Sequence, residues 1–361
     1  MAKSCEFLSD LETKEINTQL LSVKNIQTDI DSIQLVADTL RNGGLVAIPT
    51  ETVYGIAANA LDEKAVSRIF SVKGRPQDNP LIVHIADIED LDALVQEVTP
   101  YAQKLAEAFW AGALTMVLPS NGLIPKSVNA GLDTIAVRMP GLPITCEIIR
   151  RAGVPIAAPS ANMSGRPSPT TAQHCIADLW GKVDIIADGG ECAVGVESTV
   201  ISLIDNVPRI LRPGSITPQQ IAEVLGCHIE IDKAVFAEIE QNAQVFSPGM
   251  KYKHYSPEAP VTILDGDTEQ VMKYLSEKNE DGVWALVFDE DMPFLPVSGI
   301  SLGKFDDVEE QAFRLFSALR KLDEKGAKEI YVRMPNRVGI GLAVYNRIMK
   351  AAGFSILDLR F

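Results

Sequence analysis

The sequence is short of cysteine and aromatic residues, and it contains no long apolar run. Its 361 residues include five scattered cysteines without a C-x-x-C pair, and aromatic residues make up 6%. This cysteine usage argues against a disulfide framework and fits a reducing, cytoplasmic setting best. No apolar run approaches the roughly 18 residues that span a bilayer. Residues 1–15 carry several acids and no apolar core, so we expect neither a membrane segment nor a signal peptide.

Common metal- and nucleotide-binding signatures are also absent. The four histidines lie far apart and form no H-E-x-x-H motif, so we expect no zinc held by the protein. No G-x-x-x-x-G-K-[ST] segment occurs, which excludes a P-loop. The segment 339–341 (Gly-Ile-Gly) opens a predicted helix after a predicted strand, but it lacks the third glycine of a dinucleotide fingerprint. Nucleotide binding and tight turn packing both stay open there.

The sequence contains enough hydrophobic residues for a large core, and its net charge is acidic. Hydrophobic residues make up 46% of the chain and charged residues 22%, which is a globular balance and excludes disorder as the main state. The 48 acidic and 33 basic residues give a net charge of −15. That charge argues against a protein that coats nucleic acid, although it leaves room for a small basic pocket that binds an anionic substrate.

Strand-like and helix-like apolar patterns alternate along two stretches of the chain, which predicts the α/β class. We expect residues 1–16 to be a tail, 17–225 to form a first domain and 260–361 to form a smaller, Rossmann-like α/β domain. Residues 226–259 have weak periodicity and include the Gly- and Pro-punctuated segment 247–257, so we interpret them as a linker.

The individual elements follow from the same patterns. In the first domain we predict strands at 45–48, 81–85, 114–118, 134–138, 155–158, 184–188 and 199–204, and helices at 33–40, 63–72, 91–109 (interrupted near Pro100), 143–152 and 217–225. In the second domain we predict strands at 261–264, 283–288 and 329–333, and helices at 267–278, 307–322 and 340–351.

Six segments of the first domain combine small hydroxyl residues, loop glycines and prolines, and isolated bases. They are 49–55 (PTETVYG), 73–84, which contains Lys-Gly-Arg-Pro, 134–138, 159–170, 195–199 (GVEST) and 211–214 (LRPG). Several follow strands, and open α/β sheets bind ligands at the carboxyl ends of their strands. Each has a structural alternative: solvated charges at Lys73 and Arg75, a core position for His84, an ion pair for Arg138, and helix caps within 160–171. Their joint occurrence favours a binding site.

These segments resemble the motifs of the YrdC-like family. The Pro-Thr-Glu-Thr-Val-Tyr-Gly, Lys-Gly-Arg-Pro, Ser-Ala-Asn-x-Ser-Gly and Glu-Ser-Thr segments occur in the family's order, and the linker SPGMKYKHYSP is similar to that of its long, two-domain form. The resemblance covers about residues 17–361. It implies a YrdC-like domain with a twisted open sheet, followed by a smaller Rossmann-like domain with three layers.

The resemblance also implies an activity, that of L-threonylcarbamoyladenylate synthases. These enzymes join L-threonine, bicarbonate or carbon dioxide, and ATP, and they release pyrophosphate. Their product feeds the threonylcarbamoyl modification of a tRNA adenosine by a downstream transferase complex. Mg²⁺ is expected to arrive with ATP, held mainly by phosphates and water.

The resemblance further implies a set of binding residues. We expect Arg138 to bind the threonine carboxylate in bidentate fashion. The rest of the threonine side is expected at Thr52, His84, Ala158 and Ser198. The ATP side is expected at Lys73, Arg75, Asn79, Thr134, Ser160, Asn162, Ser168, Arg212 and Tyr255.

The linker and the overall function each keep an alternative. Lys251, Tyr252, Lys253 and His254, with Tyr255, suggest a lid that excludes water from the cleft, and a strap that docks the domains is the alternative. A non-catalytic RNA-binding module of the same fold is the alternative function, and the acidic charge weighs against it. A related carbamoyl-transfer enzyme is a third interpretation, although the cysteine pattern of a zinc-finger domain is missing. Direct binding of tRNA and the task of the second domain stay open.

Overall fold

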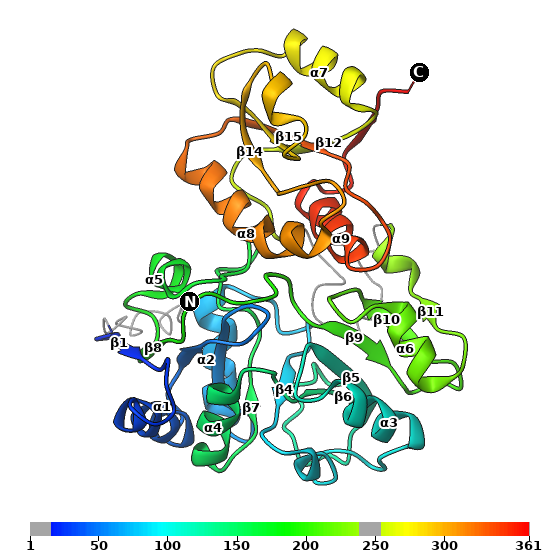
Figure 1. Cartoon of the computed structure of the whole chain (residues 1–361). Coiled ribbons are helices and arrows are strands. Elements are labelled where there is room, and N and C mark those ends of the chain that lie inside the picture. Colours follow the sequence, from blue (N-terminus) through cyan, green and yellow to red (C-terminus); the bar gives the residue numbers. More distant parts are fainter. Residues whose placement is uncertain (1–15, 238–253, 361) are drawn as a thin grey trace, which may run out of the picture.

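The computed structural model describes residues 16–237 and 254–360. Within them lie an 11-stranded sheet with parallel and antiparallel neighbours and a 5-stranded sheet that is parallel throughout. Figure 1 shows the larger sheet with its helices in the lower part of the molecule and the smaller sheet in the upper part. The predicted α/β class, with a large open sheet and a smaller α/β unit, is confirmed.

The large sheet has the strand order β1-β8-β2-β3-β7-β4-β6-β5-β9-β10-β11. Its strands are β1 (Gln19–Ser22), β2 (Val46–Ile48), β3 (Gly55–Asn59), β4 (Ile82–His84), β5 (Leu114–Pro119), β6 (Thr134–Arg138), β7 (Ile156–Ala157), β8 (Ile185–Asp188), β9 (Thr199–Ser202), β10 (Arg209–Arg212) and β11 (Glu230–Ile231).

The central pair β4 and β6 determines which side chains share one face of this sheet. The two strands are parallel, with Ile82 opposite Ala136 and His84 opposite Arg138. Because side chains alternate between the faces of a strand, His84 and Arg138 lie on the same face as Ile82, Ala136 and Thr134. Arg138 and Thr134 therefore mark two ends of one row on that face.

The helices of this part connect the strands. They are α1 (Ile30–Arg41), α2 (Glu63–Lys73), α3 (Pro100–Phe109), α4 (Pro143–Ala152), α5 (Ala172–Leu179) and α6 (Pro218–Leu225), with short 3₁₀ turns at Ile88–Leu91 and Lys233–Val235. In α2 the Asp62 side chain accepts hydrogen bonds from two backbone amides of the first turn, and Gly74 ends the helix with φ 61°. Glycine adopts that left-handed conformation without strain. The turn places Lys73 and Arg75 beside the central strands.

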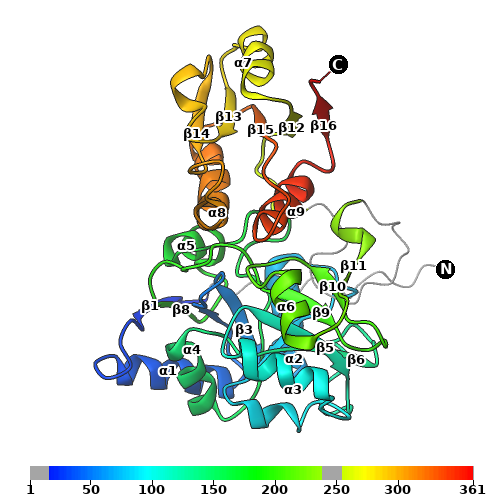
Figure 2. The same cartoon turned by 45° about the vertical axis from the view of Figure 1, so that its right-hand side comes forward.

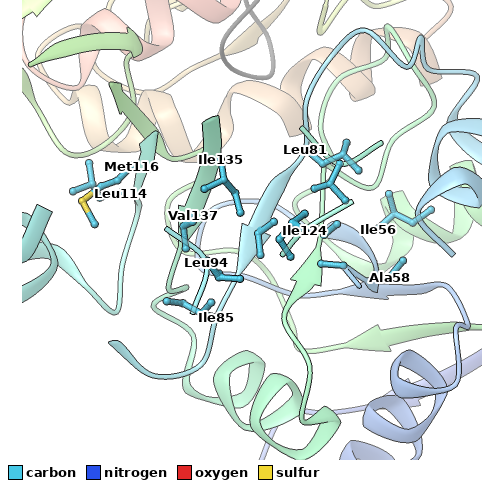
Figure 3. Packing of buried hydrophobic residues seen from close by; sticks show 14 of the residues in the cluster. Ile56, Ala58, Leu81, Ile85, Leu94, Leu114, Met116, Ile124, Ile135 and Val137 are labelled. Atoms are coloured by element: carbon cyan, nitrogen blue, oxygen red, sulfur yellow. The ribbon is translucent and has the colours of Figure 1, made fainter. Parts of the chain in front are cut away.

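The core between the large sheet and its helices is mainly aliphatic, as the low aromatic content predicts. Ile56, Leu81, Ile135 and Val137 are fully buried or nearly so. Figure 3 shows them together around the central strands. Burying such side chains contributes roughly 1.5–3 kcal/mol each.

The second sheet has the order β14-β13-β15-β12-β16. Its strands are β12 (Val261–Asp265), β13 (Val283–Val287), β14 (Ser298–Ser301), β15 (Glu329–Arg333) and β16 (Ile356–Asp358), and its helices are α7 (Thr268–Glu277), α8 (Val308–Glu324) and α9 (Gly341–Ala351), with a 3₁₀ turn at Met292–Phe294. In Figures 1 and 2, α8 and α9 lie between this sheet and the first part of the molecule. These two helices therefore form the inner layer at the junction.

Several details differ from the sequence-based prediction, and two of them bear on the domain boundaries and helix starts. The helix expected over 91–109 is wrong in its first half, because Thr99 caps a new helix whose first residue is Pro100. Proline suits that position, since its missing N–H would be unpaired there anyway. The large sheet also includes β11, beyond the expected end of the first domain at residue 225. Across residues 16–237 and 254–360, none of the helices has the length and apolar character that crossing a membrane requires.

Candidate active site

A cavity lies over the face of the large sheet that carries Ile82, His84 and Arg138. Its lining comes from six loops and strand ends of the first part and from the chain that enters the second: Thr50, Val53, Tyr54, Gly55, Lys73, Arg75, Ile82, His84, Arg138, Ala158, Pro159, Ser160, Asn162, Ser164, Gly165, Glu197, Ser198, Arg212, His254 and Tyr255. Four of these side chains are cationic and one is acidic. The cavity is therefore suited to anionic ligands although the whole chain is acidic.

Arg138 forms one end of the cavity and is held on three sides. Its guanidinium donates to the hydroxyl of Thr52 at 2.9 Å, to a carboxylate oxygen of Glu51 at 2.5 Å and to the carbonyl of Gly112 at 3.2 Å. The other carboxylate oxygen of Glu51 is buried and has no hydrogen-bond partner among the described residues. A guanidinium fixed in this way is preorganised to bind a carboxylate.

His84 lies beside Arg138 and is uncharged at neutral pH. Burial, and then the positive charge of Arg138, lower the pKa of His84 to about 3, while the carbonyl of Ile82 has a smaller, opposite effect. That carbonyl lies 3.2 Å from Nδ1. Because a carbonyl only accepts, Nδ1 carries the proton, and Nε2 is left as an acceptor.

Ser198 and Arg212 form a second polar group in the cavity. Arg212 donates to the carbonyl and to the hydroxyl of Ser198, each at 3.1 Å. The Ser198 hydroxyl also shares a 2.8 Å hydrogen bond with the hydroxyl of Thr115. All three side chains are buried, so the position of the Ser198 hydroxyl is fixed by the strands around it.

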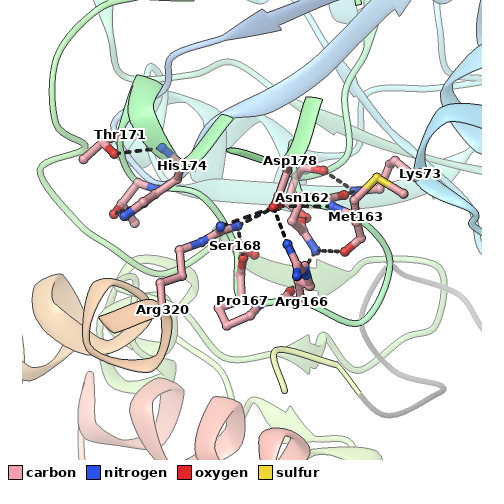
Figure 4. Close-up of polar contacts among 12 residues, drawn as sticks. Lys73, Asn162, Met163, Arg166, Pro167, Ser168, Thr171, His174, Asp178 and Arg320 are labelled. Carbon is pink, nitrogen blue, oxygen red and sulfur yellow. Dashed lines mark hydrogen bonds and ion pairs between the residues drawn. The ribbon is translucent and has the colours of Figure 1, made fainter. Parts of the chain in front are cut away.

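Lys73 binds the loop of residues 160–162, which also lines the cavity. Its ammonium group donates to the carbonyl of Ser160 and, at 2.5 Å, to the carbonyl of Asn162. The Asn162 amide in turn donates to the carbonyls of Met163 and Arg166, each at 2.8 Å. Figure 4 shows this group of contacts. Burial, and then the charge of Arg75, lower the pKa of Lys73 well below its usual value, so a phosphate nearby would favour its charged form.

Most of the expected binding residues line the cavity. Those that do are His84, Arg138, Ala158 and Ser198 for threonine, and Lys73, Arg75, Ser160, Asn162, Arg212 and Tyr255 for ATP, with His254 of the expected lid. Thr52 lies behind Arg138 rather than in the lining. Lys251, Tyr252 and Lys253 lie outside the described residues.

Three residues expected on the ATP side are absent from the lining. Ser168 is fully buried and donates to Glu197 at 2.6 Å. Thr134 begins β6 and is half-buried. Asn79 is 1% exposed, and both polar atoms of its side chain lack a hydrogen-bond partner among the described residues. Buried amides are normally paired, so the Asn79 side chain has the capacity for a further hydrogen-bond partner.

Glu197 also lines the cavity, although the sequence analysis assigned no role to it. One carboxylate oxygen accepts from Ser168, and the other accepts from Arg347 of α9 at 2.8 Å. Burial raises the pKa of Glu197, but the charges of Arg347 and Arg212 and the Ser168 hydroxyl outweigh it, so that pKa lies below its usual value. Glu197 is therefore a carboxylate held by cations from both parts of the molecule.

The described part of the chain contains no group of three or more His, Cys, Asp or Glu side chains that could hold a metal ion. Four free cysteines are described, and three of them are buried. Burial raises the pKa of Cys146 to about 11 and that of Cys192 to about 12. Neither thiol has the character of an activated nucleophile.

Fold and cavity together define an α/β protein with a built site for an anionic ligand, and comparisons with known proteins name the family. The family model described as telomere recombination, which groups Sua5, YciO and YrdC, matches residues 38–214. The model for the threonylcarbamoyl-AMP synthase C-terminal domain matches residues 216–353. The chain therefore carries both parts of a two-domain arrangement.

Full-length relatives agree with these matches. The threonylcarbamoyl-AMP synthase of Pyrococcus abyssi is 46% identical over 91% of this chain and 96% of its own length, and that of Bacillus subtilis is 44% identical over 92% and 96%. The crystal structure of P. abyssi Sua5 with L-threonine has a TM-score of 0.86 at 43% identity, covering 94% of this chain and 99% of that one. The chain belongs to the threonylcarbamoyl-AMP synthase family, in its two-domain Sua5 form, and the resemblance inferred from the motifs is confirmed.

Proposed function

We propose that this chain is a threonylcarbamoyl-AMP synthase that uses L-threonine, bicarbonate or carbon dioxide, and ATP with its Mg²⁺. The observation that carries the proposal is the convergence of Arg138 and His84 with Lys73, Arg75 and Arg212 on one cavity. A guanidinium beside a neutral imidazole suits an amino acid, and three further cations suit a polyphosphate. The family relationship supports the same conclusion.

We place threonine at the Arg138 end of the cavity. Its carboxylate would pair with Arg138, and Nε2 of His84 would accept from its ammonium or hydroxyl group. Ala158 and Ser198 would complete this side, while Thr52 would act through Arg138, which its hydroxyl holds. This placement leaves the amino group facing the rest of the cavity.

We place the nucleotide along the row that runs from Ile82 toward Thr134. Arg75, Ser160, Asn162 and Arg212 would contact the phosphates, with Lys73 behind the loop. The unpaired amide of Asn79 would gain a partner there. Tyr255 lines the same cavity from the linker, so it would also contact the nucleotide.

The chemistry then requires little covalent work from the protein. The neutral amine of threonine adds to carbon dioxide and loses a proton, which gives a carbamate. A carbamate oxygen forms a bond to the α-phosphorus of ATP, and the bond to pyrophosphate breaks. Fixed cations stabilise the charge on the phosphoryl group, and orientation of the two substrates supplies the rest.

The remaining assignments belong to the same proposal. Residues 17–225, extended by β11 of the large sheet, would form the catalytic domain, the rest of 226–259 the linker and 260–361 the second domain. The linker would act as a lid that keeps water from the product, and the product would pass to a tRNA threonylcarbamoyl transferase complex. Free thiols, as at Cys146 and Cys175, suit the reducing cytoplasm in which we place the protein.

The test is pyrophosphate release from ATP with threonine or bicarbonate omitted in turn, together with detection of threonylcarbamoyl-AMP by mass spectrometry. We expect release only when all three substrates are present, and an Arg138→Leu variant should fail to form product. Pyrophosphate release that is independent of threonine, or RNA binding without any turnover, would contradict the proposal. The second result would favour the RNA-binding alternative.

A further inference from the structure

An arginine of the second domain binds a residue that lines the cavity. Arg347 lies in α9 and is fully buried. Its guanidinium donates to the carboxylate of Glu197 at 2.8 Å, to the carbonyl of Pro213 at 2.8 Å and to the carbonyl of Glu197 at 3.4 Å. One side chain of the second domain thus binds two separate loops of the first.

Both loops carry residues of the cavity. Glu197 precedes Ser198, and Pro213 follows Arg212, which donates to the carbonyl and hydroxyl of Ser198. The two loops also touch directly, since a Cβ on Gly214 would lie 2.3 Å from the backbone nitrogen of Thr199. A guanidinium bonded to both loops therefore fixes their separation.

The same guanidinium also faces the linker. The centre of its charge lies 5.7 Å from the centroid of the Tyr255 ring, within the range of a cation–π contact. Tyr255 packs on Phe316 of α8, with ring centroids 5.2 Å apart. Tyr255 has φ 63°, an unusual conformation for a residue other than glycine, and these contacts hold it there.

We propose that Arg347 is a positioning residue of the active site: through Glu197, Pro213 and Tyr255 it fixes the loop of Ser198 and Arg212 and the linker in the arrangement that binds the substrates. The second domain thus completes the site rather than only covering it. This inference deepens the proposed function and rests on it for the identity of the substrates. The contacts of Arg347 on which the inference rests do not depend on that function.

The chain offers a matched control in Arg320 of α8. Arg320 is also a buried arginine of the second domain, and it donates to the carboxylate of Asp178 at 2.8 Å and to the carbonyl of Pro167 at 2.6 Å. Figure 4 shows this pair. Neither Arg320 nor Asp178 lines the cavity. Loss of Arg320 should therefore weaken the junction of the domains without releasing the loop of Ser198.

The experiment compares Arg347→Met, Arg347→Lys and Arg320→Met in the full-length chain. The first readout is amide hydrogen exchange without ligands, which needs no assumption about the reaction. We expect Arg347→Met to raise exchange at residues 196–199 and 212–214 by about tenfold or more, and Arg320→Met to raise it around residues 163–178 instead. Equal exchange at 196–199 and 212–214 in the two Met variants would overturn the proposal.

The second readout is formation of threonylcarbamoyl-AMP. Arg347→Met should lower kcat by roughly 10- to 100-fold relative to the parent chain, because small displacements of binding groups cost that much. Arg347→Lys, which keeps the charge but not the fork of donors, should recover part of the loss. A kcat of Arg347→Met equal to that of the parent, or no recovery by lysine, would contradict a positioning role. If the parent chain forms no product, the proposed function is wrong. The exchange result then still tests whether Arg347 holds the two loops in place.

Discussion

Arg138 has two kinds of partner, those inside the protein and the carboxylate of the proposed substrate. Glu51 binds one side of its guanidinium, and the Thr52 hydroxyl binds another. Arg138 is 4% exposed, so its charge would be costly without such partners. The ion pair with Glu51 therefore explains how the Arg138 cation can be buried before an anionic substrate binds.

Replacing Arg138 with lysine should weaken threonine binding more than it disturbs the fold. A single ammonium group cannot reproduce the planar fork, so we expect KM for threonine to rise by roughly 10- to 100-fold, which corresponds to about 1.5–3 kcal/mol for a charged hydrogen bond. Steady-state kinetics at varied threonine would measure it. Arg150→Lys is the control, because Arg150 pairs with Asp87 at the exposed surface, and an equal rise in KM there would contradict the assignment.

The low pKa of His84 predicts how the free energy of unfolding changes with pH in the acidic range. The folded pKa of about 3 lies below the ordinary value of 6.5, so between these values the unfolded chain binds a proton that the folded chain does not. Stability is therefore fully present above about pH 6.5 and decreases as the pH falls toward 3. A His84→Asn variant should lose this contribution, and its unfolding free energy should depend less on pH between 7 and 5.

Urea unfolding at several pH values would measure that difference, with a limiting slope for the parent of about 1.4 kcal/mol per pH unit from this one group. The same argument predicts that His84 adds no inflection near pH 6.5 to the activity profile. Parent and variant curves with identical pH slopes would show that His84 titrates normally in the folded protein.

Residues that line the cavity or hold its loops could be predicted from the sequence only where they stand in a recognisable local pattern. Lys73, Arg75 and Arg138 do so, and the cavity contains them. Arg347 does not, because it lies within the apolar pattern of a helix, and its partner Glu197 is 150 positions away. A long-range ion pair leaves no local signal, and a single sequence cannot reveal it.

At the scale of elements, short strand ends and tight turns place the site. Gly214 follows β10 and lies against the backbone of residues 197–199, where a Cβ would come within 2.3 Å of a nitrogen atom. Contacts below 3.0 Å with backbone cannot be relieved by a side-chain movement. This close approach explains why the LRPG segment needs a glycine at position 214, which the sequence pattern alone does not explain.

Gly214→Ala should therefore displace Ser198 and lower both stability and activity. We expect a loss of about 1–3 kcal/mol in the free energy of unfolding, as for other overpacked positions, and a fall in kcat/KM larger than stability alone explains. Gly181→Ala is the control, since its Cβ meets nothing within 4 Å but its φ of 76° strains an alanine by about 1–2 kcal/mol. Equal activity in the two variants would show that the turn does not position the site.

Elements with strong periodicity were predicted well, whereas several short strands, among them β1, β3, β10 and β16, were not. The helix Pro143–Ala152 and the strand Glu329–Arg333 have the predicted bounds. The strand β3, with sequence GIAAN, was missed because glycine, alanine and asparagine have low strand propensity. Its neighbours β2 and β7 hold it in the sheet, so tertiary context outweighs local preference there.

At the scale of the molecule, the junction of the two domains contains two buried ion pairs. Arg320 pairs with Asp178 and Arg347 with Glu197, and all four side chains are at most 9% exposed. Gly195 also lies so close to α8 that a Cβ would come within 2.4 Å of the carbonyl of Ala312. Breaking such a buried pair by removing one partner costs about 3–5 kcal/mol. The domains should therefore be strongly coupled.

This coupling predicts that both domains unfold together, and the three tryptophans allow a test. Trp110 and Trp180 report on the first domain, and Trp284 of β13 reports on the second. A Trp284→Phe variant and a Trp110→Phe/Trp180→Phe variant should give coincident urea transitions by fluorescence, since separating the domains would expose both ion pairs. Adding Arg320→Met to each should lower the midpoints and separate the two curves, because about 3–5 kcal/mol of coupling is lost. Curves that already differ before that substitution would mean that the buried pairs do not join the domains into one cooperative unit, and the second domain would then hold the active site only loosely.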